Sequence, residues 1–236
     1  MSKRFEELDW RETPIGEISL RRRVEPTLQV DVYEVRLGEE YLMSSLFTVA
    51  EEALAALGLA ALDHEDLDVI VGGLGLAYTA GAALADQRVR SLHVVEALSP
   101  VIDWHERKLL PLSPPIVDDP RCHLVHGDFF ALVAGGSGFG SGTPARVDAV
   151  LLDIDHTPSH VLNGSHSAFY SPDGLRHLAD RLNPGGVFAL WSDDPPEDAF
   201  LGVLREVFTT ADGHLVEFPN PLTGGTSSNG VYVARL

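Results

Sequence analysis

Titratable side chains gather directly after an apolar segment in the second half of the 236-residue chain. The segment DAVLL is followed by Asp153, Asp155 and His156. A carboxylate in such a position can hold a protonated amine and accept its proton, and a histidine that titrates near neutral pH can act as the base. These three residues are therefore the candidate catalytic group, with Asp155 and His156 as competing choices for the group that handles the amine.

Two further histidines, His160 and His166, lie in the same loop. Their H-T-P-S-H spacing in a proline-containing loop matches no established ligand pattern, so we expect no metal. The alternative is that the histidines pack and hydrogen-bond over a pocket. Trp191, Asp193 and Asp194 in WSDDPP either wall that pocket or form a capped turn.

A second group of residues suits a nucleoside. Glycine-rich DVIVGGLG closes one apolar segment, and Glu96 lies 23 residues after Gly73 at the end of LHVVE. Glycines let the backbone approach a ligand, and an acidic residue at this distance can accept both ribose hydroxyls. Asp128 in HGDFF could accept from an adenine amino group, with Phe129 beside the ring. The alternatives are helix-capping roles for both acids. The predicted cofactor-binding residues are Gly73, Leu74, Gly75, Glu96, Asp128 and Phe129.

The candidate catalytic and cofactor-binding residues are far apart in the sequence, so a sheet must bring them together. From Asp68 onward, apolar strands alternate with helical segments, which indicates a mostly parallel sheet covered on both faces. The segments HLVEFP and GVYVARL predict an antiparallel edge. The two alternating segments within residues 13–43 predict antiparallel strands, and a helix is expected from Ser44 or Ser45 to Leu57, ended by Gly58. We predict a small N-terminal β-rich domain, residues 1–62, and a Rossmann-like methyltransferase fold in residues 63–236.

The amino-acid composition argues against some classes of binding partner. The net charge of −18 repels nucleic acid and anionic lipid and favours cationic ligands. We therefore expect no nucleic-acid partner, and no apolar segment approaches the ~20 residues of a membrane helix. One cysteine, Cys122, and no secretory signal pattern are compatible with a cytoplasmic protein. The N-terminal strands should either cover the site or pair two copies in a homodimer.

Five segments, in their order and spacing along the chain, resemble the spermidine synthase family, the polyamine aminopropyltransferases. They are VGGLGLAYTAGAAL, VVEALSPVIDWHERKL, DPRCHLVHGDFFAL, VDAVLLDIDHTPSH and FYSPDGLRHLADRLNPGGVFAL. The resemblance covers nearly the whole chain. It implies ribose binding by Glu96, adenine contact by Asp128, and transfer of an aminopropyl group from decarboxylated S-adenosylmethionine to a cationic amine.

Two motifs depart from the family pattern. The family loop GGGDGG reads GGLGLA here, with Leu74 or Gly75 where its amine-binding aspartate would fall. The family motif D-x-x-D-P reads D-I-D-H-T-P, so its second aspartate is displaced to Asp155 or replaced by His156. Two alternatives therefore stay open: a methyltransferase that uses intact S-adenosylmethionine, and a non-catalytic nucleoside-binding protein.

Overall fold

The computed structural model describes residues 5–112, 114–136 and 138–236. Its N-terminal part is an antiparallel sheet of four strands in chain order. The strands are β1 (Phe5–Thr13), β2 (Gly16–Val24), β3 (Asp31–Leu37) and β4 (Glu40–Ser44). The alternating segments predicted β2 and β3, whereas β1 is acidic and has too few apolar residues to stand out. Three consecutive arginines at positions 21–23 of β2 form ion pairs with neighbouring strands, as in Arg22–Glu6 at 2.8 Å and Arg23–Glu34 at 2.6 Å.

The larger part is a seven-stranded sheet in the order β10-β11-β9-β8-β5-β6-β7. The strands are β5 (Leu67–Gly72), β6 (Val89–Glu96), β7 (Cys122–His126), β8 (Val147–Leu152), β9 (Leu182–Ser192), β10 (Thr210–Asn220) and β11 (Gly225–Arg235). Strands β5 to β9 run parallel, and β10 and β11 form the antiparallel edge. The α/β fold predicted from the sequence is confirmed.

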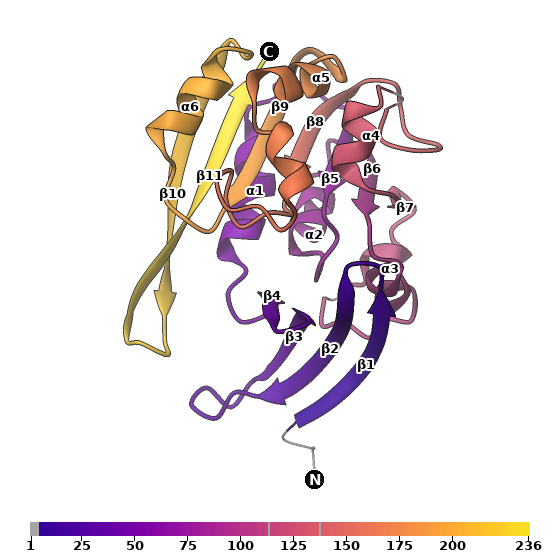
Figure 1. The fold of residues 1–236 in the computed structure, drawn as a ribbon, viewed down its shortest axis with the longest axis vertical. Coiled ribbons are helices and arrows are strands. Elements are labelled where there is room, and N and C mark those ends of the chain that lie inside the picture. Colours follow the sequence, from indigo (N-terminus) through magenta and orange to yellow (C-terminus); the bar gives the residue numbers. More distant parts are fainter. Residues whose placement is uncertain (1–4, 113, 137) are drawn as a thin grey trace.

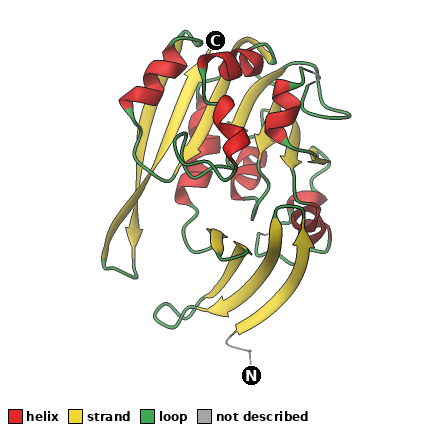
Figure 2. Ribbon diagram, viewed as in Figure 1, coloured by secondary structure: helices red, strands yellow, loops and turns green. Residues whose placement is uncertain are grey.

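Helices cover both faces of this sheet, which explains why the central strands β5 and β8 are buried at every residue. The helices are α1 (Val49–Ala60), α2 (Tyr78–Ala85), α3 (Ser99–Glu106), α4 (Phe129–Ala134), α5 (Pro172–Ala179) and α6 (Asp198–Arg205), with short 3₁₀ turns at Ile116–Asp118 and Gly164–Ala168. Alternate residues of β5 enter different cores: Val69 and Val71 pack with α1 to α3, and Ile70 packs with α4 to α6. The layers are visible in Figure 2.

Helix α1 differs from its predicted bounds. Ser44 belongs to β4, where it pairs with Glu34 of β3, and the helix begins at Val49. Gly58 lies inside the helix and does not end it. A Cβ there would come 2.7 Å from Leu151 Cδ2, so glycine permits α1 to pack closely on β8. Helix α1 packs on the large sheet, and the domain division after residue 62 stays a prediction.

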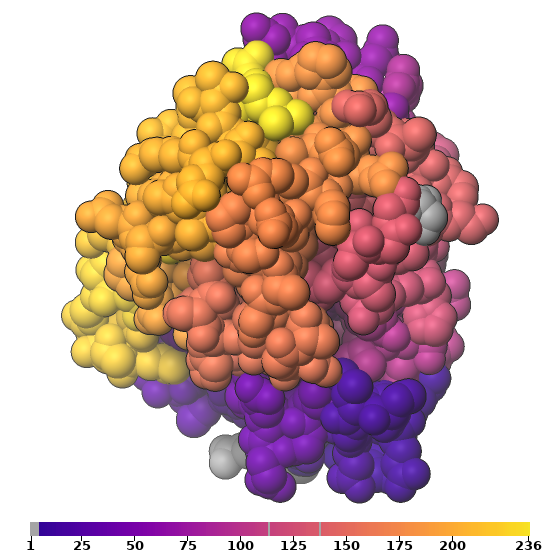
Figure 3. All heavy atoms as spheres, turned by 45° about the horizontal axis from the view of Figure 1, so that its top comes forward, coloured from indigo at the N-terminus to yellow at the C-terminus, as the bar shows by residue number. Residues whose placement is uncertain are grey.

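The N-terminal sheet lies beyond the carboxyl ends of β5 and β8 (Figure 1). Its apolar residues Ile18, Leu20 and Val35 join the core that contains α1 and α2. In the space-filling view, the N-terminal sheet packs directly against the large part of the molecule (Figure 3). Within residues 5–112, 114–136 and 138–236, no helix is long and apolar enough to cross a membrane.

Candidate active site

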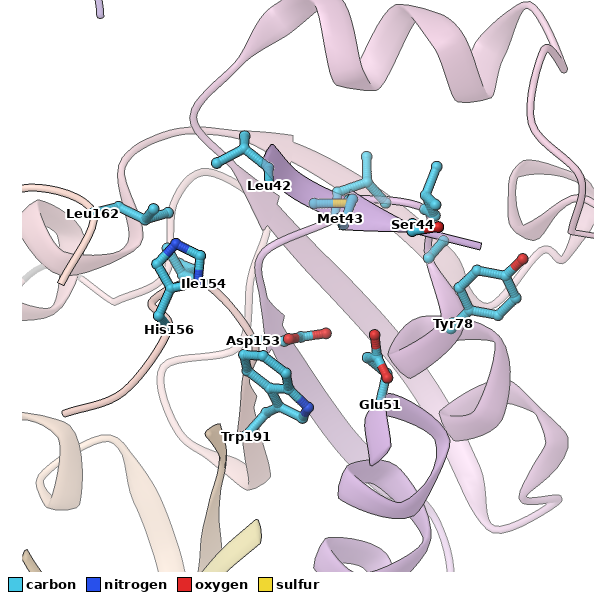
Figure 4. Close-up of a pocket in the computed structure, with 14 residues that line it drawn as sticks. Leu42, Met43, Ser44, Glu51, Tyr78, Asp153, Ile154, His156, Leu162 and Trp191 are labelled. Atoms are coloured by element: carbon cyan, nitrogen blue, oxygen red, sulfur yellow. The ribbon is translucent and has the colours of Figure 1, made fainter. Parts of the chain in front are cut away.

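A cavity of about 90 Å³ lies between β4, the start of α1, and the loops that follow β5 and β8. Figure 4 shows the side chains that point into it. The lining residues are Leu42, Met43, Ser44, Glu51, Leu74, Gly75, Leu76, Ala77, Tyr78, Asp153, Ile154, His156, Leu162 and Trp191. The walls are therefore mainly apolar, with two carboxyl groups among them.

Asp153 follows β8 directly and is held at the carboxyl edge of the sheet. Its backbone N–H donates to the Gly72 carbonyl oxygen at 2.8 Å, which ties the end of β8 to the end of β5. Its Oδ2 accepts a 2.7 Å hydrogen bond from the hydroxyl of Thr79. Burial raises the pKa of Asp153 to about 6, and the Thr79 hydrogen bond opposes that rise because it favours the ionised form.

Glu51 enters the same cavity from the first turn of α1. Its carboxyl group and that of Asp153 face each other across the cavity (Figure 4). Burial first, and then the negative charge of Asp153, raise the pKa of Glu51 to about 8. The sequence analysis did not identify Glu51. The lining has no lysine or arginine among its described residues, so this carboxyl pair lacks a strong cationic partner there.

The indole of Trp191 forms another wall of the cavity. Its Nε1 is buried and has no hydrogen-bond partner among the described residues. Figure 4 shows this nitrogen on the side of the ring nearest Glu51. An aromatic face beside carboxyl groups is an environment that suits an alkylammonium group.

The glycine segment closes one end of the cavity in a backbone conformation that favours glycine. Gly73 has φ +95° and Gly75 has φ +46°. A Cβ on Gly73 would collide with the carbonyl oxygen of Asp153, and one on Gly75 would lie 2.6 Å from Met43 Sδ. The thioether of Met43 therefore fills the space that a side chain at position 75 would need. His105 Nε2 contacts the Gly75 carbonyl oxygen at 2.8 Å and supports the turn from outside.

Glu96 ends β6 beside the glycine segment but does not line the cavity. Its carboxylate accepts from the backbone N–H groups of Leu74 at 3.1 Å and Leu98 at 2.7 Å. Burial raises the pKa of Glu96, and these hydrogen bonds act against the rise. The side chain thus joins the glycine turn to the segment after β6, which leaves the ribose-binding role a prediction.

Asp128 and Phe129 lie at the end of β7, next to Glu96 in the order of the sheet. Asp128 is exposed and accepts from the Ala131 N–H at 3.1 Å, so it caps α4, which is compatible with a second role toward a ligand. Phe129 is buried in the core with α4 to α6, where it stacks on Phe139 at 5.9 Å between ring centroids. The ring is enclosed by the core and does not line the cavity, and its place beside an adenine ring stays a prediction.

Asp155 has a different place from the one predicted. Its side chain is fully buried outside the cavity lining. It accepts hydrogen bonds from the Leu162 N–H at 2.7 Å and the Tyr170 hydroxyl at 2.8 Å, and it pairs with His166 Nδ1 at 2.9 Å. The loop after β8 folds around this carboxylate. Asp155 therefore holds the loop, and the geometry does not support it as the carboxylate that binds an amine.

His156 lines the opposite side of the cavity from α1. Its Nε2 lies 3.3 Å from Glu40 Oε1 at the start of β4, and its ring lies 5.1 Å from that of His160. His156 thus makes polar and packing contacts at the cavity wall, and its role as a base stays a prediction. Within the part of the chain that the structure describes, no three metal-ligating side chains cluster.

Two polyamine aminopropyltransferases are similar to this chain in sequence. No family model matches the chain. Polyamine aminopropyltransferase 2 of Pseudomonas aeruginosa is 28% identical over 171 residues, which cover 70% of this chain and 46% of that protein. Polyamine aminopropyltransferase of Prochlorococcus marinus is 28% identical over 191 residues, which cover 75% of this chain and 62% of that protein. The chain thus spans about half to three fifths of the length of these relatives.

Solved structures extend the likeness to the fold. Spermidine synthase from Thermotoga maritima superposes with a TM-score of 0.72 at 19% identity, covering 97% of this chain and 72% of that one. This chain has the spermidine synthase fold. A spermidine synthase in complex with the transition state analogue AdoDATO has a TM-score of 0.70 at 18% identity, with the same coverages. The resemblance to the spermidine synthase family, predicted from the sequence, is confirmed.

The positions at which the two motifs depart from the family pattern supply neither acid of the cavity. The glycine segment supplies no acid at position 75, and the second aspartate of the loop, Asp155, is taken up by internal hydrogen bonds. The two acids in the cavity come from α1 and from the end of β8. Glu51 carries no motif of its own in the sequence. Its position in an EE pair at the start of a helix is the only signal, and such pairs are common in exposed helix starts.

Proposed function

We propose that this protein transfers an aminopropyl group from decarboxylated S-adenosylmethionine to a cationic amine. The observation that carries the proposal is the facing pair of carboxyl groups, Glu51 and Asp153, in a small cavity whose described lining has no lysine or arginine. Such a cavity attracts ammonium groups and disfavours carboxylates, because no side chain of opposite charge compensates a buried carboxylate there.

This charge distribution supports the choice between the two forms of the donor. Intact S-adenosylmethionine carries an α-carboxylate, which the carboxyl pair would repel if it entered the cavity. The decarboxylated form carries only an ammonium in that part of the molecule. The nucleoside end would be held at the carboxyl ends of β6 and β7, with Glu96 as the ribose acceptor and Asp128 as the adenine contact.

The same groups support the acceptor chemistry. Asp153 would hold the incoming ammonium at the end of β8, and the apolar walls would enclose its alkyl chain. Positioning of this kind turns a bimolecular displacement into an effectively intramolecular one. The amine nitrogen then attacks the carbon next to the sulfonium, and the C–S bonding electrons remain on sulfur as methylthioadenosine leaves.

Calorimetry with S-adenosylmethionine, its decarboxylated form and methylthioadenosine tests the donor preference directly. We expect the decarboxylated form to bind more tightly than intact S-adenosylmethionine by about tenfold or more, with mass-spectrometric detection of aminopropylated amine as the activity readout. In Asp153→Asn this preference should shrink while methylthioadenosine binding is retained. Tight binding of intact S-adenosylmethionine without turnover of any amine would instead support the methyltransferase or binding-protein alternatives.

A further inference from the structure

Glu51 and Asp153 are unequal members of the carboxyl pair. Asp153 accepts the Thr79 hydroxyl at 2.7 Å, whereas the carboxyl of Glu51 is supported by its own backbone N–H. Asp153 lies directly after a strand, while Glu51 projects from the first turn of a helix, and the Glu51 side chain has one more torsion with which to follow a ligand (Figure 4). Geometry alone therefore suits Asp153 to a fixed anchoring role and Glu51 to a mobile one.

The two groups also differ in which of them keeps a proton. Around Glu51 stand the acids Asp153, Glu52 and Asp193, with Tyr78 and His156 on other walls of the cavity. Burial raises the pKa of both groups, and the Thr79 hydroxyl favours the ionised form at Asp153. Glu51 is therefore the member of the pair that stores a proton while no amine is bound.

We propose that Glu51 is the catalytic base: from the first turn of α1 it faces Asp153 across the cavity, and it takes the proton that an amine held beside Asp153 must lose. This inference rests on the proposed function. The positive charge of the ammonium stabilises the ionised form of Glu51, so binding releases one proton to solvent. The pair then carries two negative charges around one positive charge.

In the transfer step with a primary amine, the ammonium gives one proton to the Glu51 carboxylate, which becomes a carboxylic acid, and the amine becomes neutral. The nitrogen lone pair forms a bond to the carbon beside the sulfonium, the C–S bond breaks, and its electron pair neutralises the sulfur. The product is a secondary ammonium, and Glu51 returns its proton to solvent. Asp153, held by Thr79, stays ionised beside the positive charge throughout.

The test compares Glu51→Gln with Glu52→Gln, an exposed neighbour in the same helical turn that lies outside the cavity lining. We expect Glu51→Gln to lower kcat at pH 7.5 by 100-fold or more and to leave methylthioadenosine affinity within about threefold. The kcat of Glu51→Gln should increase tenfold with each pH unit up to the pKa of the free amine, because a neutral amine needs no base. Glu52→Gln should match the unsubstituted protein. A Glu51→Gln variant with kcat within threefold, or with a flat pH dependence, would overturn the assignment.

A second measurement separates this inference from the proposed function. Calorimetry with putrescine in two buffers of different ionisation enthalpy, at pH 7, counts protons released on binding. We expect about one proton from the unsubstituted protein and none from Glu51→Gln. If the protein turns over no amine, aminopropyl transfer is wrong, yet proton release that depends on Glu51 still supports the stored proton. Binding without proton release, or no binding of putrescine, overturns the role of Glu51 whatever the reaction.

Discussion

The Thr79 hydroxyl donates a partly buried 2.7 Å hydrogen bond to the Asp153 carboxylate, which joins the start of α2 to the end of β8. The same hydroxyl oxygen lies 3.3 Å from the backbone carbonyl oxygen of Glu51 in α1. One buried threonine of α2 therefore contacts both segments that carry the carboxyl pair. The contact fixes the Asp153 carboxylate directly and lies beside the backbone of Glu51.

Thr79→Val should raise the pKa of Asp153, because the hydrogen bond that favours its ionised form is removed. Because the Asp153 carboxylate loses a hydrogen-bond donor, the substitution should also lower the free energy of unfolding at pH 8 by about 1–3 kcal/mol. Carboxyl NMR titration and urea unfolding measure the two effects. Thr79→Ser, which keeps the hydroxyl, is the control; equal effects of both substitutions would point to packing.

The carboxyl pair should make stability fall as pH rises. Both groups have folded-state pKa values above their ordinary values of 3.8 and 4.5, so the native state binds more protons than the unfolded state over pH 4–8. The free energy of unfolding therefore decreases through pH 4–6 because of Asp153 and through pH 5–8 because of Glu51.

Glu51→Gln should remove the second part of that decrease. The variant should be more stable than the unsubstituted protein at pH 8, by on the order of 2 kcal/mol, and should differ little at pH 4.5. Denaturant unfolding at a series of pH values checks this. A variant curve parallel to that of the unsubstituted protein would show that Glu51 titrates normally.

Asp155→Asn should destabilise the protein and not act on catalysis directly. The carboxylate joins Tyr170, His166 and the Leu162 N–H, and replacing one oxygen by an NH₂ group opposes some of these donors. We expect a loss of about 2–4 kcal/mol in the free energy of unfolding. Tyr170→Phe, which removes one hydrogen bond, should lose less. Unchanged stability together with abolished amine turnover would instead restore Asp155 to the catalytic role predicted from the sequence.

Asp128→Asn offers a test of nucleoside binding that spares the helix. Asparagine caps helices as well as aspartate, so α4 and the melting temperature should change little. If the carboxylate accepts from an adenine amino group, methylthioadenosine should bind more weakly by about 1–3 kcal/mol. Asp128→Ala should lose the cap as well. Equal methylthioadenosine affinity in Asp128→Asn and the unsubstituted protein would show that Asp128 caps α4 and does not bind the nucleoside.

The sequence by itself determined the fold class and the strand ends that carry the site. Apolar segments such as LDVIVG and VDAVLL are continuous because helices cover both faces of the sheet, and the residues after them must lie at one edge. Asp153 and Glu96 could therefore be placed from the chain alone. Strand β1 could not, because its residues FEELDWRET are mostly polar and its strand conformation depends on backbone pairing with β2, a partner that the local sequence does not reveal.

Only the tertiary structure decided which acids share the cavity. Glu51 and Asp153 are about a hundred positions apart in the chain, and the packing of α1 on β8 and α2 brings them face to face. Asp155, two residues from Asp153, is turned away because the chain has left the strand and folds its loop around that carboxylate. Local spacing predicts which residues lie near a strand end, whereas the direction of each side chain there depends on contacts made by distant segments.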